Sequence, residues 1–365
     1  MNGIYVHIPF CVSKCHYCDF YSVSNQEIVE SYFKRLKKEI YSYKKYGKLP
    51  VDTVFFGGGT PSLPNEKYIC ETLLCIYDCF DVCKNSEITL EMNPKTFDEN
   101  KLKAYKNAGV NRLSVGLQSA NDDELLKIGR IHTSDDFLKS YELIKKVGFD
   151  NVSVDIMYGL PYSDIDTLSK TSRFVKSLGT QHISAYALTL CENTPIMNMN
   201  YNYPDNDRVY EQYKFLCQEF SEYRHYEISN FGKIPSRHNL KYWKLDSYIG
   251  FGASAYSYFD NKRFNNVKSI QEYIERENSV EDIYENTFMD NLNEYIMLSL
   301  RCDEGINTEY MKNKFSYTFP CDKKEYIAKL KNANYVSYTK KGFRLTEDGF
   351  FVSNSIISEL LIDKQ

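Results

Sequence analysis

The alternation of two kinds of segment is the feature that most constrains the fold of this chain. Short runs rich in β-branched and aromatic residues alternate with longer stretches whose apolar residues recur at helical spacing. The expected strands cover residues 3–10, 51–56, 87–92, 112–117, 151–158 and 182–189, and the expected helices cover residues 27–46, 66–83, 98–108, 134–147, 164–178 and 205–222. Because strands that alternate with helices pair in parallel through right-handed crossovers, the pattern predicts an open doubly wound sheet or a β/α barrel.

The residues at the carboxyl ends of these strands favour the barrel. Polar residues and glycines gather there, namely Gly57, Gly58, Gly59, Glu91, Gln118, Asp155 and Thr189. In β/α barrels the functional residues lie at this end of the strands. We therefore predict an α/β protein built on a partial (β/α)6 barrel.

The pattern changes beyond about residue 225, so we expect further units there. Residues 248–258 are rich in Gly, Ser and Tyr, and helical spacing returns at 267–276 and 289–302. Residues 306–365 have the order helix, helix, strand pair, helix, which resembles a small winged-helix fold. The predicted domains are a barrel core over 1–200, an α+β extension packed on the barrel over 201–290, and a small winged-helix-like domain over 291–365.

Composition excludes several classes of protein. The formal net charge of −4, with no basic recognition helix near the C-terminus, argues against a nucleic-acid-binding protein. No run of about 20 apolar residues is present, so we expect no transmembrane segment, while a peripheral membrane contact is left open. Eleven cysteines without a secretory signal indicate a cytoplasmic chain with reduced thiols rather than a disulfide framework.

The strongest local signal is the triplet Cys11, Cys15 and Cys18, which stands as CVSKCHYC in the loop after the first strand. Three nearby thiolates can hold a [4Fe–4S] cluster and leave one iron without a protein ligand. The alternative is a set of small buried residues, or a zinc site completed by His7 or His16. Zinc sites usually contain paired CxxC motifs, so we favour the cluster.

Other cysteines receive no chemical role. Cys75, Cys79 and Cys83 follow one another at a spacing of four and are expected to form an apolar stripe on one helix.

Residues 5–20, together with Gly57-Gly-Gly-Thr-Pro61, resemble the radical S-adenosylmethionine (SAM) superfamily, in its coproporphyrinogen-oxidase-like branch. The resemblance extends through most of the chain and makes the barrel a radical-SAM barrel. Further matching segments lie at residues 91–94, 112–119, 129–132, 155–161, 186–189 and 250–257.

The resemblance implies that SAM binds the open iron of the cluster and is cleaved by an electron that the cluster supplies. Glu91 and Gln118 would contact its ribose or carboxylate side, and Arg130 its carboxylate. The alternatives are that strand-end acids cap helices and that Arg130 is a surface charge. The residues implied to contact SAM are Tyr5, Gly58, Gly59, Thr60, Glu91, Gln118, Arg130, Asp155, Ala187 and Tyr256.

Two groups of the branch are candidates, the oxygen-independent coproporphyrinogen III oxidases and the heme chaperones. The oxidases carry a further cysteine two residues after the third, where this chain has Phe20, and a longer segment before the triplet, where this chain has ten residues. The element His238-Asn-Leu-Lys-Tyr242-Trp243 resembles the heme-associated motif of the chaperones. It would place His238 as an axial iron ligand with Tyr242 and Trp243 beside the macrocycle. The alternative is a capped turn that anchors the extension on the barrel.

We therefore interpret the chain as a protein that binds a [4Fe–4S] cluster, SAM and heme and delivers heme to acceptor proteins. An electron donor for the cluster is a further expected partner. Whether the chain is also an enzyme is left open, because an oxidative decarboxylase of the coproporphyrinogen oxidase type is the alternative. A plain iron–sulfur electron carrier is disfavoured, because such a protein would have no use for the residues that the resemblance implies to contact SAM.

Overall fold

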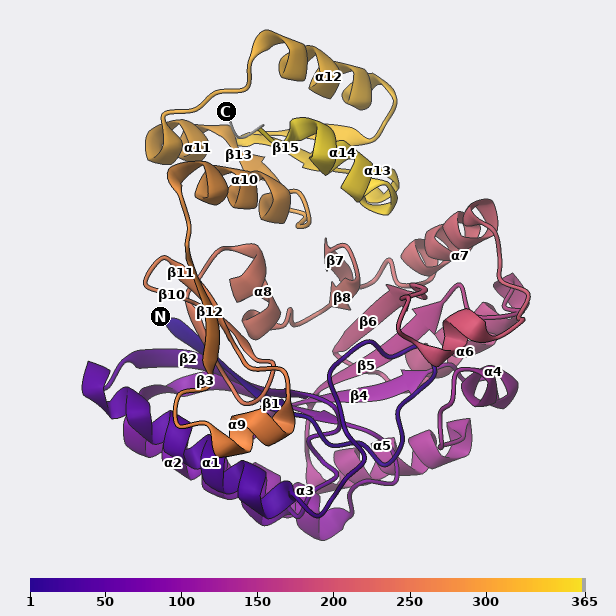
Figure 1. The fold of residues 1–365 in the computed structure, drawn as a ribbon. Coiled ribbons are helices and arrows are strands. Elements are labelled where there is room, and N and C mark those ends of the chain that lie inside the picture. The colour runs from indigo at the N-terminus through magenta and orange to yellow at the C-terminus, as the bar shows by residue number, and fades with distance from the viewer. Residues whose placement is uncertain (363–365) are drawn as a thin grey trace.

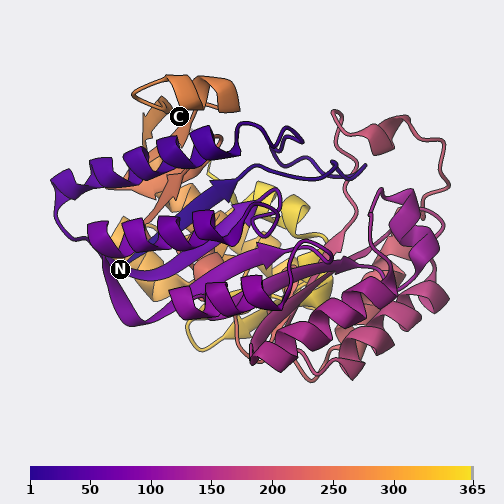
Figure 2. The ribbon, with the colours of Figure 1, turned by 90° about the horizontal axis from the view of Figure 1, so that it is seen from below.

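The computed structural model describes residues 1–362 and confirms the predicted α/β partial barrel (Figure 1). Its parallel strands are β1 (Asn2–Ile8), β2 (Pro50–Gly58), β3 (Asp81–Met92), β4 (Arg112–Gln118), β5 (Asn151–Tyr158) and β6 (His182–Ala187). The helices that follow them are α1 (Val29–Ser42), α2 (Glu66–Cys79), α3 (Glu99–Ala108), α4 (Asp122–Lys127), α5 (Ser134–Val147), α6 (Ile165–Ser177) and α7 (Asn206–Glu219). These helices lie along the outer face of a curved sheet (Figures 1 and 2).

The sheet continues past both ends of the six-strand barrel. Its full order is β12-β11-β10-β9-β1-β2-β3-β4-β5-β6-β8-β7, with β9 parallel to β1 and β8 antiparallel to β6. The added strands are β7 (Arg224–Glu227), β8 (Asn230–Gly232), β9 (Tyr248–Phe251), β10 (Tyr256–Phe259), β11 (Lys262–Asn266) and β12 (Val280–Glu285). The segment predicted to pack on the barrel therefore extends its sheet.

The two faces of the barrel strands differ in polarity because side chains alternate along a strand. In β1, Ile4, Val6 and Ile8 belong to the apolar core between sheet and helices, whereas Tyr5 and His7 occupy the alternate positions. The other strands repeat this pattern, with the inner positions held by Thr53, Glu87, Glu91, Arg112, Ser114, Ser153, Asp155, His182 and Ser184. The barrel interior is consequently lined by polar side chains.

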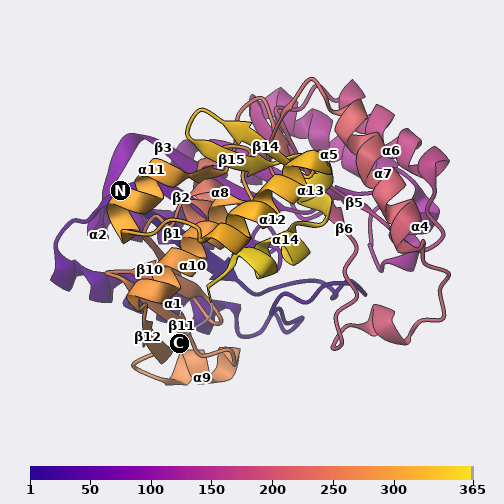
Figure 3. The ribbon, with the colours of Figure 1, turned by 90° about the horizontal axis from the view of Figure 1, so that it is seen from above.

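The C-terminal part contains the predicted two helices, strand pair and final helix, and adds a short strand before them and a second helix at the end. It consists of α10 (Phe288–Ser299), β13 (Ile306–Asn307), α11 (Thr308–Phe315), α12 (Cys321–Asn332), β14 (Val336–Thr339), β15 (Gly342–Leu345), α13 (Glu347–Phe351) and α14 (Ser353–Leu360). Its sheet has the order β13-β15-β14. This unit lies over the end of the barrel near α8 (Arg237–Trp243) and β7 (Figures 1 and 3).

The predicted helix over 66–83 is too long. Helix α2 ends at Cys79, Phe80 is extended, and β3 begins at Asp81, where it pairs with Pro50 of β2. Cys75 and Cys79 are buried in the core as expected, but Cys83 lies in the strand and is half-buried. Strand pairing therefore overrides the helical spacing of the third cysteine.

A buried carboxylate attaches the extension to α1. Glu39 accepts hydrogen bonds from the backbone N–H of Gly252 at 3.0 Å, from Asn266 Nδ2 at 2.6 Å and from the hydroxyl of Tyr273 on α9 (Ile270–Glu275). Burial raises the pKa of Glu39, and these hydrogen bonds act in the opposite direction. One α1 side chain thus organises the chain from the end of β9 to α9.

Replacing Glu39 by Ala should destabilise the fold by about 3 kcal/mol, because several buried donors lose their acceptor. Urea denaturation followed by circular dichroism measures this change. The matched control is Glu71→Ala, which removes only the exposed ion pair with Lys37 and should change the free energy of unfolding by about 0.5 kcal/mol or less. Equal effects of the two substitutions would contradict the role assigned to Glu39.

Candidate functional site

The cysteine triplet lies on the loop that follows β1 and crosses the carboxyl ends of the strands. Cys11, Cys15 and Cys18 are half-buried and form no disulfide. The backbone N–H of Cys18 donates to the carbonyl of Cys15 at 3.2 Å, and the N–H of His16 donates to the carbonyl of Ile128 at 3.0 Å. These contacts fix the loop against the turn after α4.

The three sulfurs of the triplet are free and are not drawn together around one point. In the described part of the chain, the three sulfurs do not all lie within 4.8 Å of one another. A single tetrahedral zinc ion would bring them to about 3.8 Å. Burial raises the pKa of the Cys11 thiol and raises that of Cys18 to about 11; the thiol of Cys15 adds to both rises, and that of Cys11 adds to the rise at Cys18.

A chain of polar contacts connects the triplet to the ends of β2 and β3 and to the turn after α4. Cys11 Sγ lies 3.6 Å from Thr60 Oγ1, and Arg130 Nη1 donates to Cys15 Sγ at 3.7 Å. Asn93 joins Thr60 to Arg130, because its Nδ2 donates to Thr60 Oγ1 at 2.8 Å and its Oδ1 accepts from Arg130 Nη2 at 2.5 Å. Sequence analysis did not single out Asn93, although it lies two residues beyond Glu91 in a segment that carried the family resemblance.

The glycines after β2 allow the strand ends to approach one another. Gly58 has a φ of +112°, and a Cβ there would lie 2.5 Å from the ring of His7. A Cβ at Gly59 would lie 2.9 Å from the backbone of Phe10. The N–H of Gly58 donates to Glu91 Oε2 at 3.0 Å, which ties the ends of β2 and β3 together. Larger residues would therefore force the cluster loop and β2 apart.

Two carboxyl groups lie inside the barrel beneath this face. Burial raises the pKa of Glu91 to about 7, and the nearby charge of Asp155 adds to the rise. Burial also raises the pKa of Asp155, although hydrogen bonds from Ser184, Ser114 and Ser153 and the charge of Arg112 oppose it.

The remaining expected SAM residues occupy different parts of the same face. Gln118 is buried at the end of β4 with a φ of +69°. The side chains of Gln118 and Arg130 pack against Gly116, because a Cβ there would lie 2.8 Å from Gln118 Nε2 and 3.1 Å from Arg130 Nη2. Ala187 is exposed at the end of β6. Tyr5 and Tyr256 line one cavity of about 530 Å³. The predicted residues therefore gather around the carboxyl ends of the strands, with Ala187 and Tyr256 on exposed positions.

Helix α8 holds the expected heme residues. His238 is fully buried, its Nδ1 lies 2.9 Å from Thr53 Oγ1, and its Nε2 lies 2.8 Å from the hydroxyl of Tyr242. The carboxylate of Glu87 accepts the backbone N–H groups of Arg237 and His238, both at 3.0 Å. Burial, assisted by the charge of Lys241, lowers the pKa of His238 to about 3. Neither ring nitrogen is free to bind iron in this conformation, and the geometry favours the anchoring turn.

Tyr242 and Trp243 have different surroundings. Tyr242 lines the cavity that also contains Tyr5 and Tyr256, so one expected heme residue adjoins two expected SAM residues. The Trp243 ring packs against the guanidinium of Arg301, 4.9 Å from the ring centroid, near the end of α10. The motif therefore does not form a single exposed pocket.

Two family models match the chain. Residues 5–175 match the model of the radical SAM superfamily, and residues 289–352 match that of the HemN C-terminal domain. No helix in residues 1–362 is both long enough and apolar enough to cross a membrane.

Curated relatives match over the full length. The chain is 32% identical to the heme chaperone HemW of Bacillus subtilis over 377 residues, with 99% of each chain covered. It is 31% identical to the heme chaperone HemW of Lactococcus lactis, with 99% of this chain and 98% of the relative covered. Among solved structures, the coproporphyrinogen III oxidase HemN of Escherichia coli has a TM-score of 0.87 and 19% identity, covering 98% of this chain and 89% of that chain. This likeness shows a shared fold.

Replacing Glu91 by Gln should stabilise the chain above about pH 7, because the native carboxyl is then ionised in a buried site. Between about pH 4.5 and 7 the native state retains a proton that the unfolded state releases, so the free energy of unfolding of the wild type falls as pH rises. The shift corresponds to about 3 kcal/mol at most. Urea denaturation across this pH range measures the difference.

Glu99→Gln is the control, because Glu99 is exposed, pairs with Lys103 and Lys146, and has a pKa lowered to about 2. It should give no gain at high pH. Parallel pH profiles for the wild type and Glu91→Gln would show that Glu91 titrates near its ordinary pKa.

Proposed function

Because the chain belongs to the radical SAM superfamily, in the coproporphyrinogen-oxidase-like branch that includes the proteins named heme chaperone HemW, we propose that it is a heme chaperone. In this proposal it binds a [4Fe–4S] cluster, SAM and heme in the cytoplasm and passes heme to acceptor proteins. The observation that carries the proposal is the similarity to HemW proteins of two bacteria over nearly the whole chain. A similarity confined to the barrel residues would support the cofactors but not the chaperone function.

The thiols of Cys11, Cys15 and Cys18 would hold the cluster. They are free and share one loop. When bound, the cluster and SAM supply one-electron chemistry that side chains lack. The loop supplies the ligands and places them beside the guanidinium of Arg130.

The residues around this loop would bind SAM by charge and backbone contacts. Arg130 is oriented by Asn93 and by the carbonyl of Gly116 at 3.0 Å, so its guanidinium is held beside the triplet, where it would receive a carboxylate. Glu91 offers an acceptor for hydroxyl or amino groups, because only one of its oxygens bonds to Gly58. The cavity between Tyr5 and Tyr256 offers aromatic surface beside these polar groups.

The alternative function is an oxygen-independent coproporphyrinogen III oxidase. The HemN structure shares the fold of this chain, but at 19% identity it supports the architecture alone. The residue two positions after Cys18 is Phe20, whose side chain is 69% exposed. An exposed phenylalanine at this position suits contact with a flat aromatic macrocycle such as heme, so it favours the chaperone over the oxidase.

Cys15→Ala and Gly58→Val should separate cluster binding from SAM binding. Cys15→Ala removes one of three iron ligands and should lose most of the cluster, measured by iron content and visible absorption after anaerobic reconstitution. Gly58→Val should keep the cluster but bind SAM about tenfold more weakly or worse, because a Cβ at φ +112° displaces the glycine loop. Equilibrium SAM titration on cluster-replete protein measures the second effect.

Cys321→Ala is the control, and Arg130→Lys is a second test of SAM binding. Cys321→Ala removes an exposed thiol of α12 and should change neither property. Arg130→Lys keeps the charge but loses the forked contacts to Asn93 and Gly116, and should weaken SAM binding like Gly58→Val. A full cluster in Cys15→Ala, or unchanged SAM affinity in both Gly58→Val and Arg130→Lys, would show that the site is wrongly placed.

Hemin titration and an oxidase assay should separate the two functions. We expect the wild type to bind hemin with a Soret band and to leave coproporphyrinogen III unconverted in the presence of SAM and a reductant. The reverse result would establish the oxidase alternative. A changed Soret band in folded His238→Ala would assign the iron ligand to His238 and require that its bond to Tyr242 opens on binding. An unchanged band would leave α8 as an anchor.

A further inference from the structure

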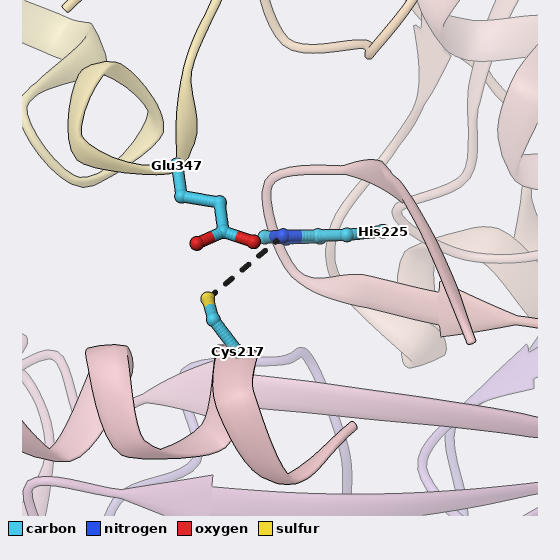
Figure 4. Close-up of side chains that lie close together, drawn as sticks. All are labelled: Cys217, His225 and Glu347. Carbon is cyan, nitrogen blue, oxygen red and sulfur yellow. Dashed lines mark hydrogen bonds between the residues drawn. The ribbon is translucent and has the colours of Figure 1, made fainter. Parts of the chain in front are cut away.

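A second group of metal-ligating side chains lies where the C-terminal unit meets the barrel (Figure 4). Cys217 stands near the end of α7, His225 on β7, and Glu347 at the start of α13. Their donor atoms all lie within 4.8 Å of one another. Within residues 1–362 no other group of three His, Cys, Asp or Glu side chains does so. Glu347, more than a hundred residues further along the chain, is thus brought to the neighbouring pair Cys217 and His225 by the fold.

The hydrogen bonds of His225 leave its second nitrogen available. Nε2 lies 3.1 Å from the carbonyl oxygen of Ile228, and because a carbonyl only accepts, Nε2 carries the proton. The lone pair of Nδ1 then faces Cys217 Sγ at 3.9 Å, along the dashed line of Figure 4. Histidines that bind metals almost always donate their other N–H to a carbonyl or carboxylate in this way.

Packing holds two of the three donors in place. The His225 ring stacks on Phe231 with centroids 4.0 Å apart and meets the edge of Phe350 at 5.3 Å. Cys217 is buried, whereas the Glu347 side chain is 49% exposed. The arrangement thus has a rigid inner part and an outer ligand through which an ion can enter from solvent.

We propose that Cys217, His225 and Glu347 bind a divalent transition-metal ion of the zinc type, which clamps the C-terminal unit to the barrel. Thiolate, imidazole and carboxylate are all zinc ligands, and the soft sulfur disfavours magnesium and calcium. Around a tetrahedral zinc ion, sulfur and nitrogen lie about 3.5 Å apart, close to the separation in this structure. Water completes the coordination, and the thiol releases its proton to solvent when the ion binds.

The neighbouring charges are compatible with an ion at this point. Lys214 Nζ lies 3.7 Å from Glu347 but 2.7 Å from Asp348, which is its main partner. The hydroxyl of Tyr213 donates to the backbone carbonyl of Glu347 at 3.1 Å and leaves the carboxylate of that residue to the ion. The contact between α7 and α13 is therefore already formed, and the ion would strengthen it. This inference does not depend on the proposed function.

Cobalt titration of the full-length chain tests the proposal. The background is the Cys11→Ala/Cys15→Ala/Cys18→Ala variant, which removes the competing thiols of the triplet. We expect Co²⁺ to bind with one ion per chain, to give thiolate-to-metal charge-transfer absorption, and to be displaced by Zn²⁺. Glu347→Gln should weaken binding about tenfold or more, and Cys217→Ala should abolish the charge-transfer band. Cys302→Ala, which removes another buried thiol, is the matched control and should bind like the background.

Several outcomes of this titration would contradict the proposed metal site. Retention of the charge-transfer band in Cys217→Ala, or loss of the band in Cys302→Ala alone, would place the ion elsewhere and overturn it. Absence of Co²⁺ binding in the folded background would also overturn it and leave a thiol–imidazole contact in the interface. Because Glu347 is half-exposed, Glu347→Gln should fold like the background, and an unchanged affinity in this variant would remove Glu347 from the site.

Discussion

The parallel alignment of β1 to β6 is the constraint on which the rest of the structure depends. It brings six carboxyl ends to one edge, so residues far apart in sequence, such as Thr60, Asn93 and Arg130, form one connected set of contacts. It also gives every strand one face toward the helices and one toward the barrel interior. The interior face carries Glu91 and Asp155, whose burial raises their pKa values. The candidate site is thus built from groups that are costly to bury.

Sequence periodicity predicted the alternating strands and helices because each carries its own local pattern, and the polar residues and glycines at the strand ends then favoured the barrel over an open sheet. It failed where a distant segment decided the outcome. Cys83 continues the helical spacing of Cys75 and Cys79, but the pairing of Asp81 with Pro50 starts a strand before it. The cysteine triplet could be singled out because its three thiols are close together in sequence. Asn93 was missed because its importance comes from Thr60 and Arg130, which only the fold brings near it.

The heme-associated motif shows the same limit more sharply. The resemblance implies that His238 binds iron, whereas in this structure the partners of its ring are Thr53 and Tyr242, and the N-terminal end of α8 is held by Glu87. Thr53 and Glu87 lie more than 150 residues earlier in the chain, and no pattern around residue 238 reports them. A motif of polar and aromatic residues can therefore be preserved by buried hydrogen bonds as readily as by a ligand. Only an experiment that separates iron ligation from anchoring distinguishes these roles.

An incomplete barrel leaves two sheet edges, and in this chain the added segments at those edges also contribute to the functional face. At the edge beside β1, the segment from β9 to α9 is tied to α1 by Glu39 and carries Tyr256. Tyr242 on α8 and Tyr5 on β1 line the same cavity as Tyr256. The groups expected to hold the cluster come from the first barrel unit, whereas the aromatic surface beside them comes from both ends of the chain, from Tyr5, Phe20 and Tyr21 and from Tyr242, Tyr248 and Tyr256. Differences in function within this branch should therefore depend on the added segments together with the loop after β1, because the two line one cavity.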